Sequence, residues 1–150
     1  MRVRAFDARD LDPVVALWNE TKRDTYDFLP AEQSRSLDDD RSFFCEHILP
    51  RCSLWVADAG RDVAGFLALA GSYVDRLYVL PALQRRGVGT ALLAHAKALS
   101  PAGLELHTHQ KNAKARAFYE KHAFEAIRFG TSPPPECEPD VEYWWRPRGA

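Results

Sequence analysis

Apolar residues recur along the chain with two periods, and their succession predicts alternating strands and helices. Polar and apolar residues alternate from Arg2 to Phe6, which is typical of a short strand. Val14, Leu17 and Trp18 then share one face of a helix. A second helix is expected from about Ser36 to Ile48. The first third of the chain is therefore predicted to be one strand followed by two helices.

Polar and proline residues mark the expected ends of these helices. Asp10 or Asp12 is suited to cap the first helix, since short polar side chains accept hydrogen bonds from the first turn. Pro50 ends the second helix because proline cannot continue it. Asn112 is the expected N-cap of a helix in the second half of the chain.

The middle of the chain reads as three strands joined by short turns. The strands are expected at Leu54–Ala57, Val63–Leu69 and Tyr73–Leu80, with turns at 59–62 and 71–72. Turns this short join only antiparallel neighbours. The segment therefore predicts an antiparallel meander.

Helices and strands alternate again after the meander. A helix starts near Gly87 and ends before Pro101, and strands are expected at 104–108, 124–129 and 141–145. The stretch from Gly130 to Pro139 is proline-rich and predicts a loop. The order β-α-α-β-β-β-α-β-α-β-β predicts a single α/β domain over residues 1–150. Its sheet is mixed and mostly antiparallel, with one right-handed crossover between parallel strands.

Composition and charge exclude several classes of protein. The formal net charge of −1 removes the main argument for a nucleic-acid partner, which would need a basic excess. The longest apolar stretch, Val63 to Ala70, is far shorter than a membrane span. Cys45, Cys52 and Cys137 form no metal-binding spacing, and their odd number argues against a disulfide scaffold. We expect a cytoplasmic protein without a metal or membrane partner.

The segment from Gln84 to Ala91 has the composition of an anion cradle. It lies between a strand and an amphipathic helix, whose first N–H groups have no partner within the helix. Gly87 and Gly89 let the backbone approach a bulky phosphate, and Arg85 and Arg86 add positive charge. The pattern matches neither GxGxxG nor GxxxxGK[ST]. A glycine-rich turn with two solvated arginines is the alternative.

A second motif follows one strand later. The segment from Asn112 to Phe124 contains NxxAxxFY, and Gln84 to Gly89 fits [QR]xxGx[GA]. With both motifs the chain resembles the GCN5-related N-acetyltransferase family. Asp75 to Pro81 also resembles the cofactor strand of that family. One position departs from the pattern, because Ala123 stands where the family usually has glycine. If the position requires a positive φ, alanine costs about 1 kcal/mol there.

The resemblance implies an acyl-CoA N-acyltransferase fold with a central, splayed pair of parallel strands. It also implies acetyl-CoA as co-substrate, with the pantetheine arm held along the strand and the diphosphate held in the cradle. The implied cofactor-binding residues are Leu77, Tyr78, Val79, Gln84, Arg85, Arg86, Gly87, Val88, Gly89, Thr90, Asn112, Ala115, Phe118 and Tyr119.

The resemblance further implies direct attack of a primary amine on the thioester. Tyr119 is the implied general acid for the leaving thiolate, with a packing role as the alternative. Asp75 is the candidate base, but a carboxylate paired with Arg76 fits the same position. His107 and His109 are weaker candidates, and a water chain is a further alternative.

The expected function is an acetyl-CoA-dependent N-acetyltransferase acting on a small-molecule or peptide amine. A non-catalytic CoA-binding or regulatory module of the same fold is the alternative. Six acidic residues between Asp24 and Asp40 could attract a cationic amine, but a solvated loop and the acidic start of a helix are the favoured explanation. A monomer and a homodimer both remain open.

Overall fold

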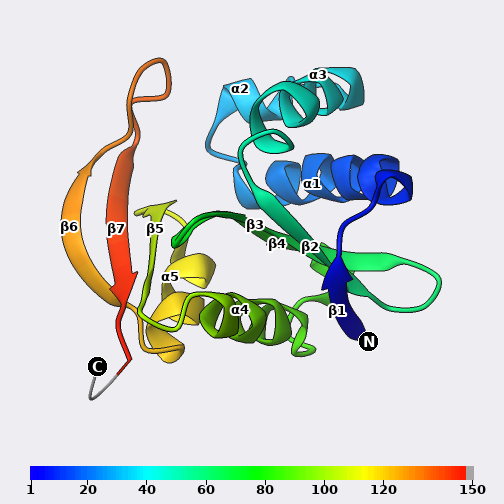
Figure 1. The fold of residues 1–150 in the computed structure, drawn as a ribbon. Coiled ribbons are helices and arrows are strands. Elements are labelled where there is room, and N and C mark those ends of the chain that lie inside the picture. Colours follow the sequence, from blue (N-terminus) through cyan, green and yellow to red (C-terminus); the bar gives the residue numbers. More distant parts are fainter. Residues whose placement is uncertain (148–150) are drawn as a thin grey trace. The chain divides into compact units, whose positions relative to one another are not determined.

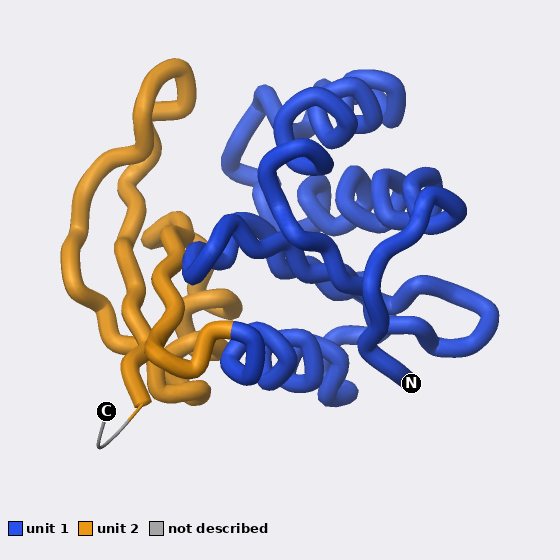
Figure 2. Tube along the Cα trace, in the orientation of Figure 1, with its two compact units in different colours: residues 1–99 blue, residues 100–150 orange. Residues whose placement is uncertain are grey.

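The order of strands and helices predicted from the sequence recurs in the structure, a computed structural model that describes residues 1–147 (Figure 1). The chain divides into two compact units, residues 1–99 and residues 100–150 (Figure 2). Each unit contains its own antiparallel strands and at least one helix. A single domain spanning 1–150 stays a prediction.

The first unit is built on four antiparallel strands that pair in chain order. Helices α1 and α4 lie on opposite faces of this part of the sheet (Figure 1). The elements of the unit are β1 (Arg2–Ala5), α1 (Leu11–Thr25), α2 (Pro30–Gln33), α3 (Leu37–Phe43), β2 (Ser53–Asp58), β3 (Val63–Ala70), β4 (Tyr73–Val79) and α4 (Val88–Leu99).

The face that carries α1 contains an apolar core. Val14 and Trp18 of α1 pack with Phe44 and with Val56 and Phe66 of the strands, and all five are buried. Burying apolar surface of this kind contributes about 25 cal/mol per Å². The predicted face of the first helix is therefore confirmed as its core face.

The start of the first helix differs from the prediction. Asp10 precedes α1, but its side chain makes no capping hydrogen bond. Its carboxylate instead accepts two bonds from the Arg4 guanidinium, at 2.8 and 2.9 Å. Asp7 caps the 3₁₀ turn Ala8–Asp10 that leads into α1, in a reciprocal capping box in which the Asp10 carboxylate accepts from Asp7 N.

The predicted second helix is confirmed in position and is more complex in form. It comprises α3 followed by a π-helical turn at Phe44–Ile48, and Ser36, at the predicted start, is its N-cap. The short α2, which begins at Pro30, was not predicted. Four residues are too few for the periodicity of a helix to show in the sequence.

The second unit is a three-stranded antiparallel sheet with one helix. Strand β7 (Pro139–Trp145) pairs with β5 (Leu104–His109) on one side and with β6 (Glu125–Thr131) on the other. Helix α5 (Ala113–Lys121) connects β5 to β6. The loop expected from Gly130 to Pro139 is shorter than predicted, because Thr131 and Pro139 already pair within the ladder.

Candidate active site

The cradle predicted before α4 has a defined backbone shape. Gln84 is extended, and its side-chain Nε2 donates to the carbonyl of Val79 at 3.1 Å, which ties the cradle to the end of β4. Arg85 and Gly87 then take positive φ values of 63° and 84°. The first helical hydrogen bond runs from Ala91 N to the Gly87 carbonyl at 3.0 Å. Gly87 is thus the residue at which the chain enters α4.

The same segment is open on the side that an anion would approach. Arg85, Arg86, Gly87 and Thr90 are exposed, whereas Val88 is buried at 7% exposure and anchors the helix start. No atom lies within 4 Å of the point that a Cβ on Gly87 would occupy. The first N–H groups of α4 point along the helix axis and carry the positive end of its dipole. This arrangement can hold a diphosphate.

Strand β4 places its predicted cofactor residues in a tightly packed environment. Val79 is buried, and the ring of Tyr78 stacks on Phe66 with centroids 5.7 Å apart. The Tyr78 hydroxyl lies 3.4 Å from that of Tyr26. A Cβ on Gly65 of β3 would come within 2.6 Å of the Tyr78 carbonyl. Glycine at position 65 therefore allows β3 to lie close to this carbonyl.

Asp75 lies at an irregularity of the sheet. The β3–β4 register passes from Ala68↔Arg76 to Leu69↔Val74, so Asp75 has no partner across the ladder. Its carboxylate lies 3.5 Å from the guanidinium of Arg76, which is the pairing weighed as the alternative to a base. Burial raises the pKa of the Cys52 thiol, and the adjacent Asp75 carboxylate raises it further. A role for Asp75 as base stays a prediction.

Helix α5 gathers the residues of the second motif. The Asn112 side chain accepts from Ala115 N at 3.1 Å and caps the helix, as predicted. Tyr119 is 8% exposed and packs edge-on against Phe118 and Phe124, with centroids 5.2 and 5.4 Å away. Tyr119 therefore does pack in the core of this unit, and its role as the general acid stays a prediction.

The departure at Ala123 is resolved by the backbone. Ala123 has a φ of 70°, so the position does require the left-handed conformation that glycine would adopt without strain. Phe124 N donates to the Tyr119 carbonyl at 3.0 Å just beyond this residue. The turn is built as the family pattern implies, with alanine in place of glycine.

A contact that the sequence did not reveal joins α5 to β7. Tyr143 is completely buried, and its hydroxyl accepts from Arg116 Nε at 3.1 Å and donates to the Glu120 carboxylate. Burial raises the pKa of this phenol, the bond to Glu120 raises it further, and Arg116 opposes both effects. In the sequence, Arg116 and Glu120 are one helical turn apart, which predicts only that they share a face of the helix. It does not indicate that this face contacts a tyrosine on a strand.

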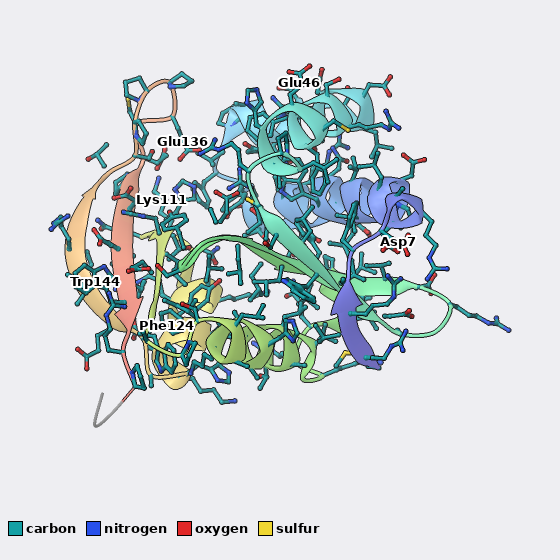
Figure 3. The ribbon with its side chains drawn as sticks, in the orientation of Figure 1. Asp7, Glu46, Lys111, Phe124, Glu136 and Trp144 are labelled. Carbon is teal, nitrogen blue, oxygen red and sulfur yellow. The ribbon has the colours of Figure 1, made fainter. Side chains whose placement is uncertain are left out.

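The two histidines considered as bases are both paired with carboxylates. His107 Nε2 lies 3.7 Å from Glu142, and His109 Nε2 lies 3.3 Å from Glu136 of the proline-rich loop. Lys111, near His109, pairs with Glu138 of the same loop at 3.5 Å. In Figure 3 the labels of Glu136 and Lys111 mark this end of the second unit.

The acidic segment expected to attract an amine is largely engaged within the first unit. Asp40 is buried and bonds to Lys22 Nζ at 2.8 Å and Arg35 Nε at 2.7 Å. Lys22 also pairs with Glu32 at 3.0 Å. Asp39 completes the capping box with Ser36, the residue before α3. The structural explanation of this cluster therefore accounts for three of its acidic residues.

Two further observations concern residues 1–147 as a whole. Their His, Cys, Asp and Glu side chains form no group of three placed to bind a metal ion. None of their helices combines the length and the apolar character that crossing a bilayer requires.

These features define a class of protein. A family model described as "Acetyltransferase (GNAT) domain" matches residues 50–126, a range that includes the cradle and α5. The chain belongs to the GCN5-related N-acetyltransferase (GNAT) family and is an N-acetyltransferase.

Individual relatives agree with this assignment. The chain is 37% identical over 115 residues to the peptidyl-lysine N-acetyltransferase YjaB of Escherichia coli K12, covering 75% of this chain and 74% of the relative. The solution structure of apo-form YjaB superposes with a TM-score of 0.80 at 28% identity, covering 99% of this chain and 98% of that one. The predicted fold class, a mixed α/β sheet of the acyl-CoA N-acyltransferase fold, is thereby confirmed.

A more distant solved structure shows the same fold. The PaiA N-acetyltransferase of Thermoplasma acidophilum, solved in complex with coenzyme A, superposes with a TM-score of 0.72 at 19% identity. The alignment covers 97% of this chain and 98% of that structure.

Proposed function

We propose that this chain transfers the acetyl group of acetyl-CoA to the side-chain amine of a protein lysine. The observation that carries the proposal is the open, positively charged entry to α4 at Gly87, within a chain that belongs to the GNAT family. The acceptor class is supported by relatives named peptidyl-lysine N-acetyltransferase, at 37% and 33% identity. Small-molecule amines and peptide N-termini are the alternatives that the experiment must separate.

The chain's own residues would bind and orient the co-substrate. Backbone N–H groups from Arg85 to Thr90 would hold the diphosphate, while main-chain groups of Leu77 to Val79 would bond the pantetheine arm. The fit is supported by the Gly87 backbone, where a side chain would fill the approach to the helix. Acetyl-CoA supplies an activated acetyl thioester. The N–H groups near Val79 would polarise its carbonyl, as fixed dipoles do at developing negative charge.

Proton transfers are assigned to side chains by resemblance. Tyr119 would donate a proton to the departing thiolate, as a positioned phenol can in general acid catalysis. The attacking lysine must lose a proton, and Asp75 is the candidate that the sequence offers. Asn112 and Phe118 would line the pantetheine arm and the thiol end, and Ala115 would also contact the co-substrate. A cytoplasmic location, the absence of a nucleic-acid or membrane partner, and the choice between monomer and homodimer also stay predictions.

The cradle is tested by a matched pair of glycine variants. Gly60, in the turn between β2 and β3, has a φ of 99° and an open Cβ position, like Gly87. Gly87→Glu and Gly60→Glu therefore carry similar backbone strain and the same added charge. We expect calorimetry to show that only Gly87→Glu loses acetyl-CoA binding, because bulk and negative charge then fill the phosphate site. Micromolar binding by Gly87→Glu would refute the cradle.

Turnover tests the reaction and the acceptor. Lysine peptides, peptide N-termini, polyamines and amino acids would be offered with acetyl-CoA, and released thiol would be measured. We expect lysine peptides to be acetylated and Tyr119→Phe to lower kcat about a hundredfold, in the range of general acid catalysis. Acetyl-CoA affinity should change little in this variant.

The outcomes separate the parts of the proposal. Thiol release with small amines alone would overturn the acceptor class and leave the activity standing. Unchanged kcat in Tyr119→Phe would remove Tyr119 as the acid. Coenzyme binding without turnover on any amine would favour the non-catalytic module.

A further inference from the structure

The Tyr143 hydroxyl connects β7 to two consecutive turns of α5. Tyr143 has 0% exposure, so its hydroxyl must find its partners within the protein. It accepts from Arg116 Nε at 3.1 Å and donates to a carboxylate oxygen of Glu120. Because the two partners are four residues apart, the phenol contacts the helix at two points along one face.

Two contact points on one face fix how the helix is turned about its axis. A single hydrogen bond would allow α5 to pivot, whereas bonds to Arg116 and Glu120 restrain it at both ends of one turn. Both bonds involve charged groups, which form the stronger class of hydrogen bond. The guanidinium of Arg116 also lies over the ring of Phe129 on β6, 5.6 Å from its centroid. Arg116 is therefore itself held in place.

Tyr119 lies on the same side of α5 as this contact. Its ring centroid is 6.4 Å from that of Tyr143 and 5.4 Å from that of Phe124. Its carbonyl accepts from His122 N and Phe124 N at 3.1 and 3.0 Å, where the helix ends. The direction of the Tyr119 phenol thus depends on the rotation of α5 and on the ring of Tyr143.

We propose that Tyr143, held by Arg116 and Glu120, is a positioning residue for acetyl transfer that sets the direction of the Tyr119 phenol. This inference rests on the proposed function, in which Tyr119 donates a proton to the leaving thiolate. Tyr143 is completely buried and would act through Tyr119. Small displacements of a reacting group lower rates steeply, so loss of the restraint should reduce turnover more than binding.

A double-mutant cycle tests the inference. Tyr143→Phe keeps the buried ring and removes only the hydroxyl. We expect kcat to fall about tenfold, while the KM for acetyl-CoA stays within about twofold. In a Tyr119→Phe background the same substitution should lower kcat no further, because groups that act through one another are not additive.

Each outcome decides a different point. If both single variants are slow and their effects multiply in the double variant, Tyr143 acts independently of Tyr119 and the positioning role is wrong. If Tyr143→Phe keeps the wild-type kcat, the role is also wrong. If Tyr119→Phe keeps the wild-type kcat, the proposed acid itself fails, and the positioning role fails with it.

Variants of Glu120 keep the test decisive if Tyr143→Phe does not fold. Glu120 is exposed, so its replacement leaves the core intact. We expect Glu120→Ala to lower kcat severalfold, and Glu120→Gln, which still accepts a hydrogen bond, to restore most of it. Glu105→Gln is the matched control: it removes the ion pair to Arg146, 3.1 Å long, on a different part of the second unit. It should leave kcat unchanged. Equal kcat in Glu120→Ala and wild type would contradict the inference.

Discussion

At the scale of single residues, the backbone next to α4 and α5 adopts the left-handed conformation at three positions. Arg85 and Gly87, just before α4, and Ala123, just after α5, all have a positive φ. Glycine adopts this conformation without strain, whereas alanine and arginine do not. The motif comparison could mark Ala123 as a departure, but only the structure shows that the strained conformation is adopted.

Replacing Ala123 by glycine should stabilise the protein. Relief of the left-handed strain is partly offset by the greater freedom of glycine in the unfolded chain, so we expect a gain of about 0.5–1 kcal/mol. Chemical denaturation would measure it. Ala117→Gly, at an exposed position within α5, is the control and should instead destabilise by about 1 kcal/mol. A loss of stability in both variants would show that position 123 is not strained.

At the scale of elements, the helices of the first unit are joined by a buried ionic network. Asp40 of α3 accepts from Lys22 of α1, from Arg35 and from Asn19 Nδ2, the last at 2.9 Å. Burial alone would raise the pKa of Asp40, but hydrogen bonds from Lys22, Arg35 and Asn19 outweigh it and lower the pKa. The sequence showed these residues only as a run of charges, because their partners come from three separate segments.

This network makes part of the stability dependent on pH. The pKa of Asp40 is lower in the folded protein than its unfolded value of about 3.9, so its contribution is present above that pH and is lost as the pH falls through the folded value. Asp40→Asn should lower the free energy of unfolding at pH 7 by about 3 kcal/mol, since it removes the buried negative charge that pairs with Lys22 and Arg35. The difference from wild type should narrow below about pH 4.

Denaturant titrations at several pH values would measure this difference. Asp38→Asn, an exposed substitution in the same helix, should change stability by less than about 0.5 kcal/mol. A constant gap between Asp40→Asn and wild type from neutral to acidic pH would contradict the assignment of the network.

At the scale of the whole molecule, the cradle and α5 belong to different compact units, residues 1–99 and 100–150. A ligand that binds only the folded chain raises its free energy of unfolding by mass action, by about 2.7 kcal/mol at a concentration one hundred times Kd. Coenzyme A should therefore raise the thermal midpoint of the full chain. Gly60→Glu should keep this shift, and Gly87→Glu should lose it. An equal shift in both variants would place the coenzyme elsewhere.

The sequence by itself determined the order of strands and helices, the capping of α5 by Asn112 and the two motifs that lead to the GNAT family. These features are local, since each depends on residues within one or two turns of each other along the chain. Only the tertiary structure decided that the Asp10 carboxylate accepts from Arg4 and that Tyr143 contacts Arg116 and Glu120. It also decided that Asp75, paired with Arg76, lies at a break in the strand register. These contacts depend on how the strands and helices pack against one another and on local irregularities of the sheet. A periodic pattern of apolar residues indicates which face of an element is buried, but not which side chain it will contact.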